Sequence, residues 1–495
     1  MSAPDGPAPH SHGAHFSPKR WEGLFGIGLG VFMFTLDTSS ANVALPTLVK
    51  AFDTTLAAVQ WVVLAYLLVL TALVLGAARV GERLGRKRAY LMGLGIFCVG
   101  AVAASLAPAI GWLIAARALQ GLGAVFVSAL GGAIVAQTFP PSERGRALGI
   151  IGSIVLGGVA LGPTLGGLTL DWFGWRGVFL QSVPVGLLAI VVISRVIPHL
   201  PPVPPRGRFD WAGAITLAAS LVAFALGLTR AQSEGFVSMQ VLALLGCAAV
   251  GVAAFVAIES RVAHPVVDLR TVRREPIGLG LALGMLVFMA LGAVTLLLPF
   301  YLQGILRYSP AKVGLLMAVS PALGMLMAPV AGMLADRIGP RRVTFVALLI
   351  LAAGCASLAT LNPESGEWGY VLHVAPFGIA MGLFTSANNS AVLNAARPDE
   401  IGIVSGLVSL ARTLGQSTGV PLGAALFALF ALGHATHGDA RALLALPVES
   451  LMRGMHWTFA GATVLAVAGT LVATRLLKVE QAAPSVVVED RKRGP

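Results

Sequence analysis

Long apolar runs separated by short polar segments fill most of the chain. A helix rises about 1.5 Å per residue, so about twenty apolar residues cross the roughly 30 Å of hydrocarbon in a bilayer. Fourteen runs come near or exceed that length, which predicts an all-α polytopic membrane protein with 14 transmembrane helices. The predicted spans lie near residues 24–48, 58–79, 89–107, 110–137, 147–170, 178–197, 211–229, 239–258, 279–303, 312–335, 343–361, 369–392, 401–431 and 456–477.

The polar segments between these runs differ in their content of basic residues. Of the 34 Lys and Arg residues, 25 fall in the two tails and in the loops that follow even-numbered spans. Another 7 fall in the remaining loops and 2 lie inside spans. Because cytoplasmic loops carry an excess of Lys and Arg, the pattern predicts both termini in the cytoplasm. The expected location is the plasma membrane, which is the inner membrane in a cell that has two.

Composition narrows the class of protein further. Hydrophobic residues make up 56% of the 495 positions and charged residues only 11%, against about a quarter charged in soluble domains. These values exclude a soluble enzyme, a disordered chain and a disulfide scaffold. The net charge of +12 follows from the basic loops, so no nucleic acid is expected as a partner. The three cysteines lie within apolar runs, and we expect them to be buried and reduced.

One loop motif occurs twice. Val80-Gly-Glu-Arg-Leu-Gly-Arg-Lys-Arg88 resembles Leu334-Ala-Asp-Arg-Ile-Gly-Pro-Arg-Arg342, and both follow an even-numbered span. Eight spans separate the copies, whereas two six-span halves would separate them by six, so we expect two extra linker helices between two pseudo-symmetric six-helix bundles. The predicted organisation is a cytoplasmic tail over 1–23, a six-helix bundle over 24–197, a linker with two extra spans over 198–275, a second six-helix bundle over 276–478 and a cytoplasmic tail over 479–495.

Two ionisable residues lie deep within the predicted spans of the first half. A charged carboxylate at the position of Asp37 costs at least roughly 2.5–3.5 kcal/mol on insertion scales. Burial disfavours the charged form, which suits a carboxyl group that exchanges a proton at physiological pH. Arg117 is its expected electrostatic partner, and Gln120 lies one turn later on the same helix face. The alternatives are that Asp37 only neutralises a buried arginine and that Arg117 only holds backbone carbonyls.

Four motifs resemble those of one family. Leu36-Asp-Thr-Ser-Ser-Ala-Asn-Val-Ala-Leu-Pro46 lies in the first span and Val80–Arg88 follows the second. Leu113-Ile-Ala-Ala-Arg-Ala-Leu-Gln-Gly121 lies in the fourth span and Gly158-Val-Ala-Leu-Gly-Pro-Thr-Leu-Gly-Gly167 in the fifth. In this order they resemble the major facilitator superfamily and, within it, the fourteen-span drug:proton antiporters of the QacA/EmrB type. The resemblance implies antiport by alternating access, with Asp37 and Arg117 in proton coupling.

The resemblance also implies residues that gate the transport cycle. The loop motif would clasp neighbouring cytoplasmic helix ends and stabilise the outward-open state, and the fifth-span motif would act as a hinge and a seal. Membrane topology and close helix packing are the alternative explanations. The expected gating residues are Glu82, Arg83, Gly85, Arg86, Lys87, Gly158, Gly162, Pro163, Gly166, Gly167, Asp336, Arg337 and Arg341.

The chain departs from the family pattern at several positions. Glu82 stands where Asp is usual and Ser182 where Asn is usual. Some drug exporters carry an acid in the thirteenth span, where this chain has Arg412 and no acid. That difference argues against efflux of divalent cations. Arg412 itself could hold a backbone carbonyl or attract an anionic group.

Aromatic and amide side chains within the spans are candidate contacts for an amphipathic substrate, and helix packing explains each of them equally well. These residues are Phe34, Asn42, Trp61, Tyr66, Gln120, Tyr301, Asn388, Asn389 and Gln416. His10, His12 and His15 could bind a metal, but a flexible tail explains them better. No metal and no other cofactor is therefore expected.

The predicted function is export of amphipathic drugs or similar small molecules in exchange for protons. Export of an endogenous metabolite or lipid on the same scaffold is the alternative. The expected partners are the substrate, protons and the lipid bilayer, with a periplasmic adaptor protein in a host that has an outer membrane. No Gly-Lys pair occurs in the chain, which excludes a phosphate-binding loop of the usual type and an ATP-driven pump within this chain.

Overall fold

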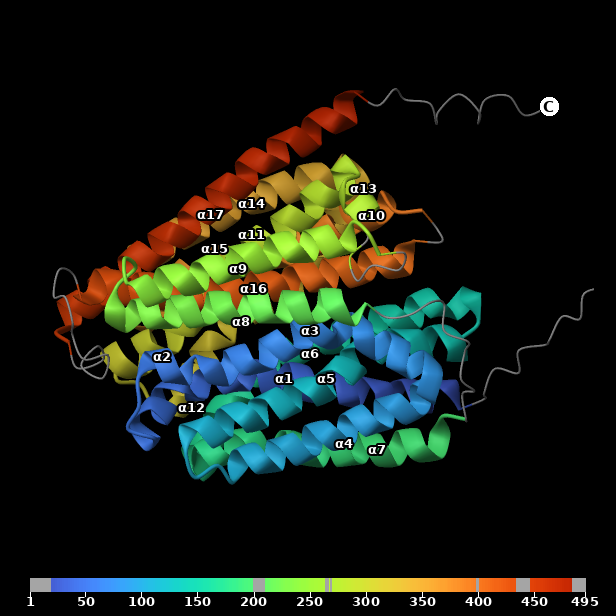
Figure 1. Cartoon of the computed structure of the whole chain (residues 1–495), viewed down its shortest axis with the longest axis horizontal. Helices are drawn as coiled ribbons and strands as arrows, with labels where there is room; N and C mark the ends of the chain where they lie inside the picture. The colour runs from blue at the N-terminus through green and yellow to red at the C-terminus, as the bar shows by residue number, and fades with distance from the viewer. Residues whose placement is uncertain are drawn as a thin grey trace, which may run out of the picture.

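The computed structural model describes residues 19–198, 210–262, 267, 269–397, 400–432 and 446–482. Within these ranges all regular secondary structure is helical. Thirteen helices are long and apolar enough to cross a membrane, and they lie side by side along one common direction (Figure 1). The chain is therefore a multi-pass membrane protein. His10, His12, His15, most of the two predicted tails and the segment 199–209 of the predicted linker lie outside the described residues.

The helices follow the predicted spans closely in position. The first part of the chain forms α1 (Arg20–Ala51), α2 (Leu56–Val59), α3 (Trp61–Leu84), α4 (Arg86–Ser105), α5 (Ile110–Thr138), α6 (Pro141–Leu180) and α7 (Ser182–Val196). Two helices follow, α8 (Trp211–Glu234) and α9 (Met239–Glu259). The last part forms α10 (Leu269–Val272), α11 (Glu275–Phe300), the π-helical turn η1 (Tyr301–Ile305), α12 (Pro310–Met317), α13 (Val319–Ile338), α14 (Pro340–Leu358), α15 (Gly366–Asn394), α16 (Ile401–Leu432) and α17 (Val448–Ala482).

The sixth predicted span, residues 178–197, differs from the others. Only α7 falls wholly within it, and this apolar helix of 15 residues is shorter than the thirteen spanning helices. The residues before it belong to α6, whose helical geometry is interrupted at Gly174 (φ 70°, ψ −176°), a conformation that glycine adopts without steric cost. A fourteenth crossing would need α7 together with the last turn of α6, and it stays a prediction.

The helices form two groups, which meet where α6 contacts α12 and where α3 contacts α16. In the first group α1 packs against α6 and α7, and α5 packs against α3 and α4. In the second group α11 packs against α16 and α17, and α15 packs against α13 and α14. Helix α8 contacts both α3 and α16, and α9 lies beside it (Figure 1). A polar contact fixes α8 to the start of α3, because Gln60 Nε2 and Trp61 Nε1 both donate to Thr229 Oγ1, at 3.1 and 3.2 Å.

The repeated loop motif has the same backbone form in both copies. Gly85 is the single residue between α3 and α4, with φ 87° and ψ 128°. Gly339 takes the corresponding place between α13 and α14, with φ 90° and ψ 142°. Positive φ is readily adopted only by glycine, which explains why each motif keeps a glycine at this point. The sequence repeat is therefore also a repeat of local structure.

A second repeat was missed in the sequence. Gly158, Gly162 and Gly166 of α6 face α1, and Gly415, Gly419 and Gly423 of α16 face α11 with the same four-residue spacing. A Cβ on Gly419 would collide with the backbone of Met289, and its distance to Met289 Cα would be 2.7 Å. Small residues at such an interface let two helices approach closely in the membrane. The spacing is visible in the sequence, so this pair of interfaces could have been predicted.

We expect Gly419→Ala to lower the thermal stability of the protein. The added methyl meets the Met289 backbone, which cannot rotate aside, and overpacking of this kind typically costs about 1–3 kcal/mol. Gly149→Ala is the matched control, because nothing lies within 4 Å of a Cβ at Gly149. The midpoint of thermal unfolding of the purified protein measures the effect. Equal midpoints for the two variants would contradict the close contact between α11 and α16.

The cysteines correct one prediction. Cys98 and Cys355 are buried and free, as expected, but Cys247 is exposed. Cys247 lies on α9, whose main neighbour is α8, so that much of α9 faces outward. An apolar run shows that a residue lies within the membrane, but it does not show whether that residue faces protein or lipid.

Candidate functional site

The two deep ionisable residues form an ion pair between α1 and α5. Arg117 Nη1 donates to Asp37 Oδ2 over 2.5 Å, and the side chains of both residues are only 1% exposed. Gln120 Nε2 donates to the second carboxylate oxygen over 3.2 Å, while its own carbonyl oxygen accepts from Arg117 Nη1 at 2.8 Å. Both carboxylate oxygens of Asp37 therefore have a donor, and the three side chains form one closed network.

The surroundings of Arg117 hold its guanidinium group in one orientation. Its Nε donates to the carbonyl oxygen of Val62 on α3 over 3.0 Å. The guanidinium carbon lies 4.7 Å from the centre of the Tyr66 ring and 5.6 Å from that of Phe179. Contacts of this kind stabilise a cation most when water is excluded. The Val62 carbonyl and Phe179 were not identified from the sequence.

The charges of this network are balanced as long as Asp37 is ionised. An ionised Asp37 balances the permanent charge of Arg117, and a protonated Asp37 would leave that charge to Gln120, the Val62 carbonyl and two aromatic rings. Intramembrane ionisable residues are costly and usually serve transport or proton transfer. In this conformation the site is enclosed, because Asp37, Arg117 and Gln120 are all buried. Exchange with either side of the membrane therefore requires the helices to move.

The fifth-span motif packs against the same helix that carries Asp37. Ser40 Oγ donates to the Gly162 carbonyl over 2.7 Å, and Ser39 Oγ donates to the Gly158 carbonyl over 3.3 Å. A Cβ at Gly166 would lie 2.8 Å from the Cα of Ser40. The glycines let α6 approach α1 closely enough for hydroxyl groups of α1 to reach the α6 backbone. Helix α6 is therefore in direct contact with the helix that holds Asp37.

The end of the same motif joins the two groups of helices. A Cβ at Gly167 would lie 2.8 Å from the Cα of Gly314 on α12, and a Cβ at Gly314 would lie 2.9 Å from the Cα of Gly167. Each glycine thus faces the other across the contact between α6 and α12. Side chains larger than hydrogen at either position would push the two helices apart.

Further contacts between the groups gather at the end of the bundle where α1 ends. Gln303 Nε2 donates to the Val43 carbonyl over 2.7 Å, and Thr47 Oγ1 lies 3.3 Å from Gln303 Oε1. Toward the opposite end, nothing lies within 4 Å of a Cβ at Gly145 or Gly149 of α6. Packing across the two groups is therefore tighter at the end near Ala51 than at the start of α6.

The loop motif contacts helices of its own group. Arg86 Nη1 donates to the Ala133 carbonyl over 3.2 Å and to Gln137 Oε1 over 3.3 Å, both on α5. Lys87 Nζ donates to the Ser194 carbonyl of α7 over 2.9 Å and to the Ile197 carbonyl that follows. Glu82 forms an ion pair with Arg79 at 3.8 Å, and Arg83 is exposed. These contacts of Arg86, Lys87 and Glu82 stay within the first group of helices, and a gating role of the motif stays a prediction.

The second copy of the motif makes fewer contacts. Asp336 and Arg337 are exposed at the end of α13, and Arg341 is partly buried in the first turn of α14. These three side chains form no ion pair with any described part of the chain. The two copies share a glycine turn but differ in how their charged side chains are held.

An ion pair outside the spans joins the starts of α11 and α16. Arg274 donates to both carboxylate oxygens of Glu400, over 2.5 and 2.9 Å. The hydrogen bond from Arg274 is the main reason that the pKa of Glu400 is lowered from its ordinary value of 4.5. A lowered carboxyl pKa means that the pair stabilises the fold above pH 4.5 and that this contribution is lost as the pH falls through the lowered value.

Replacing Glu400 with Gln should therefore have a pH-dependent effect. At pH 7 we expect a lower thermal unfolding midpoint than in the wild type, because the carboxylate is ionised and paired there. Below the lowered pKa of Glu400, the two midpoints should converge. Glu364→Gln, at an exposed loop position, is the control and should match the wild type throughout. A difference that persists at low pH would show that the effect does not arise from the ion pair.

The predicted substrate contacts are scattered through the fold. Tyr66 and Gln120 lie at the Asp37 network. Trp61 Nε1 donates to Thr229 Oγ1, and Tyr301 Oη donates to the Asn362 carbonyl over 2.8 Å. The remaining residues of the set take different places. Asn42 bonds its own helix and Asn388 bonds the Gly280 carbonyl of α11, whereas Phe34, Asn389 and Gln416 are partly buried.

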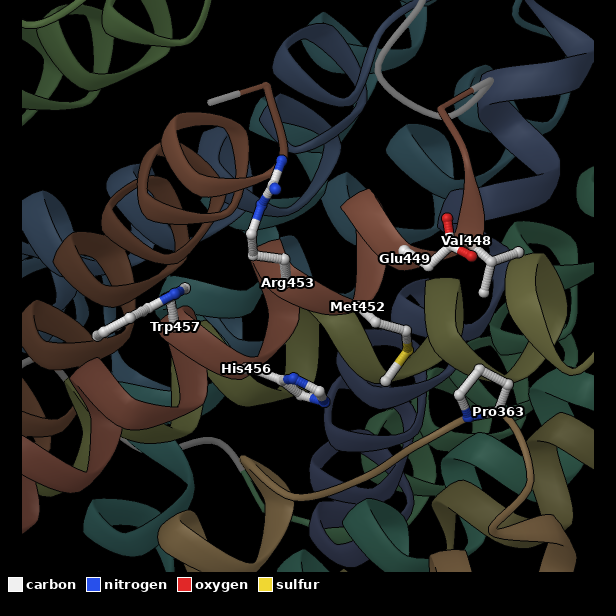
Figure 2. A pocket seen from close by; sticks show the side chains of 7 residues that line it. All are labelled: Pro363, Val448, Glu449, Met452, Arg453, His456 and Trp457. Atoms are coloured by element: carbon white, nitrogen blue, oxygen red, sulfur yellow. The ribbon is translucent and has the colours of Figure 1, made fainter. Parts of the chain in front are cut away.

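A surface hollow of about 400 Å³ lies beside the start of α17. Figure 2 shows that Arg453, His456 and Trp457 reach it from one helix. Arg453 Nε donates to the Phe430 carbonyl over 3.0 Å, and His456 Nε2 lies 2.5 Å from the Leu361 carbonyl. These polar groups join α17 to its neighbours, and no residue of the Asp37 network lines the hollow. Among the described residues, no cluster of His, Cys, Asp and Glu could hold a metal ion.

Comparison with known proteins agrees with these features. Residues 27–420 match the model of the Major Facilitator Superfamily. The riboflavin transporter RibZ of Clostridioides difficile is 30% identical, covering 83% of this chain and 89% of that protein. The multidrug resistance protein Stp of Mycobacterium tuberculosis is 34% identical, covering 80% of this chain and 74% of that protein. The tetracenomycin C resistance and export protein of Streptomyces glaucescens is 30% identical, covering 83% and 76%.

Solved structures show the same fold. A bacterial homologue of the human lysosomal transporter Spinster, in an inward-facing conformation, aligns with a TM-score of 0.64 at 16% identity, covering 93% of this chain and 98% of that one. The xylose transporter XylE of Escherichia coli aligns with a TM-score of 0.61 at 14% identity, again covering 93% and 98%. At such identities the likeness concerns the fold alone. Together with the match over most of the sequence, it shows that this chain belongs to the major facilitator superfamily.

Proposed function

We propose that this protein is a proton-coupled antiporter of the fourteen-span drug-exporting branch, which exports amphipathic small molecules by alternating access. The observation that carries the proposal is the enclosed network of Asp37, Arg117 and Gln120. It places a carboxyl group that can exchange a proton beside a permanent cation, at a depth where charge is costly. The glycine motif of α6 packs on the helix that carries it.

In this mechanism a proton and a substrate compete through Asp37. Ionised Asp37 is held by Arg117, and protonation weakens that contact because the neutral carboxyl no longer balances the guanidinium charge. The loss frees α1 to shift against α5 and, through the serine contacts with Gly158 and Gly162, against α6. Substrate leaves on the side from which the proton arrives, and the release of the proton on the other side completes the cycle.

We further propose that both termini are cytoplasmic and that the conformation is inward-facing. The distribution of basic loops places the start of α1 inside. The contacts of Gln303 with Val43 and of Gly167 with Gly314 then lie on the outer side and close it. On this account the chain comprises two six-helix bundles, with α8 and α9 as the two extra helices between them.

The relatives favour two classes of cargo. A drug is favoured by the relatives named for multidrug resistance and for tetracenomycin C export. An endogenous metabolite is the second candidate, favoured by the similarity to a riboflavin transporter over 89% of that protein's length. Both cargoes use the same coupling site, so the two candidates differ in substrate and not in mechanism.

The test uses purified protein in liposomes with an acidic interior and a pH-sensitive dye. Ethidium, riboflavin and 2-naphthoate represent a lipophilic cation, a neutral metabolite and an aromatic anion. We expect substrate-dependent proton release with at least one of them, and none in protein-free liposomes. A response to riboflavin alone would favour the metabolite. Substrate movement without any proton release would contradict proton coupling.

A further inference from the structure

Arg412 is an arginine in the middle of a spanning helix whose charge the fold leaves unbalanced. At about 1.5 Å per residue it lies roughly 16 Å from the start of α16, a helix of 32 residues. No hydrogen bond or ion pair joins its side chain to any part of the chain that the structure describes, and its Nε atom is buried without a partner. The cost of such a charge is several kcal/mol on insertion scales, as for any intramembrane arginine.

The contrast with Arg117 shows how this fold balances the charge of a buried arginine. Arg117 binds a carboxylate, an amide oxygen and a backbone carbonyl, and it lies beside two aromatic rings. Among the described residues, Arg412 has only the ring of Phe288, whose centre lies 4.9 Å from the guanidinium carbon. A guanidinium group whose Nε is buried without an acceptor is unfavourable unless a ligand supplies one.

The helix face around Arg412 is polar and reachable. Ser405, Ser409, Arg412 and Gln416 recur at intervals of four, three and four residues, so they line one side of α16. Ser405 and Ser409 are exposed, and Arg412 and Gln416 are partly exposed. Ser417 next to this face bonds Thr71 of α3 at 3.3 Å, where the two groups of helices meet. A ligand on this face would therefore lie at the meeting line of the two groups.

We propose that Arg412 binds the acidic group of an amphipathic organic anion, with the aromatic part of that anion near Phe288. The unpaired Nε belongs to one of the two donor edges through which a guanidinium binds a carboxylate or phosphate with two parallel hydrogen bonds. Gln416 and Ser409 supply neutral donors on the same face. This inference rests on the proposed function, because it assigns a chemical class to the cargo.

An anionic cargo also suits proton exchange energetically. When one proton enters and one anion leaves, two positive charges in effect move inward. At about 100 mV and one pH unit, both gradients together support accumulation on the order of 10⁴-fold, compared with about tenfold for a monovalent cation exchanged one for one. A single coupling carboxyl, Asp37, is then enough for strong export.

Equilibrium binding of 2-naphthoate and 2-naphthamide to the purified full-length protein in detergent tests the proposal. The two compounds share a ring system and differ in charge. We expect wild type to bind naphthoate at least tenfold more tightly, and Arg412→Gln to lower naphthoate affinity at least tenfold while leaving naphthamide unchanged. Arg412→Lys should recover only part of the loss, because an ammonium group lacks the paired donors. Arg230→Gln, at an exposed surface pair, should behave as wild type.

Several results would overturn this assignment. Equal affinities for the two compounds in wild type would do so, and this comparison needs no variant to fold. An unchanged preference in Arg412→Gln would also do so, as would the absence of binding by both compounds. Because no proton gradient is present, Asp37→Asn should keep the preference for naphthoate. If Asp37→Asn keeps the preference for naphthoate and transport by the wild type moves no protons, the antiport proposal fails and the assignment of Arg412 stands.

Discussion

Asp37→Asn should abolish accumulation of substrate against its gradient while leaving exchange down a gradient intact. Asparagine keeps the shape of the side chain and an oxygen that can accept from Arg117. Gln120, the Val62 carbonyl and two aromatic rings still hold the guanidinium group, so the loss of stability is smaller than when Arg117 is removed. Asparagine cannot, however, bind or release a proton at neutral pH. Without a titrating group, the proton gradient has no chemical link to the conformation of α1. We expect gradient-driven transport to fall at least about 100-fold, to the level of protein-free liposomes, as the loss of an obligatory proton carrier requires.

The two transport modes must be measured on the same liposomes. Uptake driven by an imposed pH gradient reports coupling, and substrate counterflow without a gradient reports binding and movement of the protein. Asp171→Asn is the matched control, because Asp171 is an exposed acid on α6. If Asp37→Asn still accumulates substrate, the proton binds elsewhere. If counterflow is lost as well, Asp37 serves the transport movement itself and not coupling alone.

Arg117→Met should be among the most destabilising single substitutions in the protein. It leaves the Asp37 carboxylate, which is 1% exposed, with Gln120 as its only donor. Removing one partner of a buried ion pair typically costs about 3–5 kcal/mol, because the remaining charge stays buried and unbalanced. Loss of the bond to the Val62 carbonyl adds to this effect. We expect a large fall in the thermal unfolding midpoint and in the amount of folded protein in the membrane.

The double variant Asp37→Asn with Arg117→Met should recover most of that stability but no coupling. Removing both charges of a buried pair is often neutral for stability, whereas removing one is not. Arg230→Met is the matched control, since its side chain is 57% exposed and surface pairs contribute little. If the double variant is as unstable as Arg117→Met alone, the ion pair is not the source of the instability.

Much of the fold could be predicted from the sequence, because a chain that crosses a bilayer can adopt few kinds of secondary structure there. Each of the thirteen spanning helices overlaps a predicted apolar run, since a spanning segment must satisfy its own backbone hydrogen bonds and be long enough to cross. The sixth run was less predictable, because the chain turns at Gly174 within α6, and α6 continues to Leu180 before α7 begins at Ser182. Hydropathy shows which residues are apolar, but it does not show where a glycine turns the chain.

The candidate site was predictable in part. Asp37, Arg117 and Gln120 were expected to meet, because a buried carboxylate and a buried guanidinium group in one bundle lower the cost of burial by pairing their charges. Phe179 lies far away in the sequence and is a common residue in any span, so no local signal marks its contact with Arg117. Trp61 and Tyr301 were expected to contact substrate, which stays a prediction; their polar atoms bond Thr229 and the Asn362 carbonyl, which the sequence did not indicate. Residue type alone does not separate a binding residue from a packing residue.

The most direct test of the account is proton release when substrate binds to the purified protein in weakly buffered detergent solution. Because substrate and proton are proposed to compete through Asp37, binding measured over a range of pH should release up to about one proton per transporter. The wild type, Asp37→Asn and Asp171→Asn should be compared with any cargo that binds all three. The account predicts release by the wild type and by Asp171→Asn and none by Asp37→Asn. Equal release by all three proteins would contradict it.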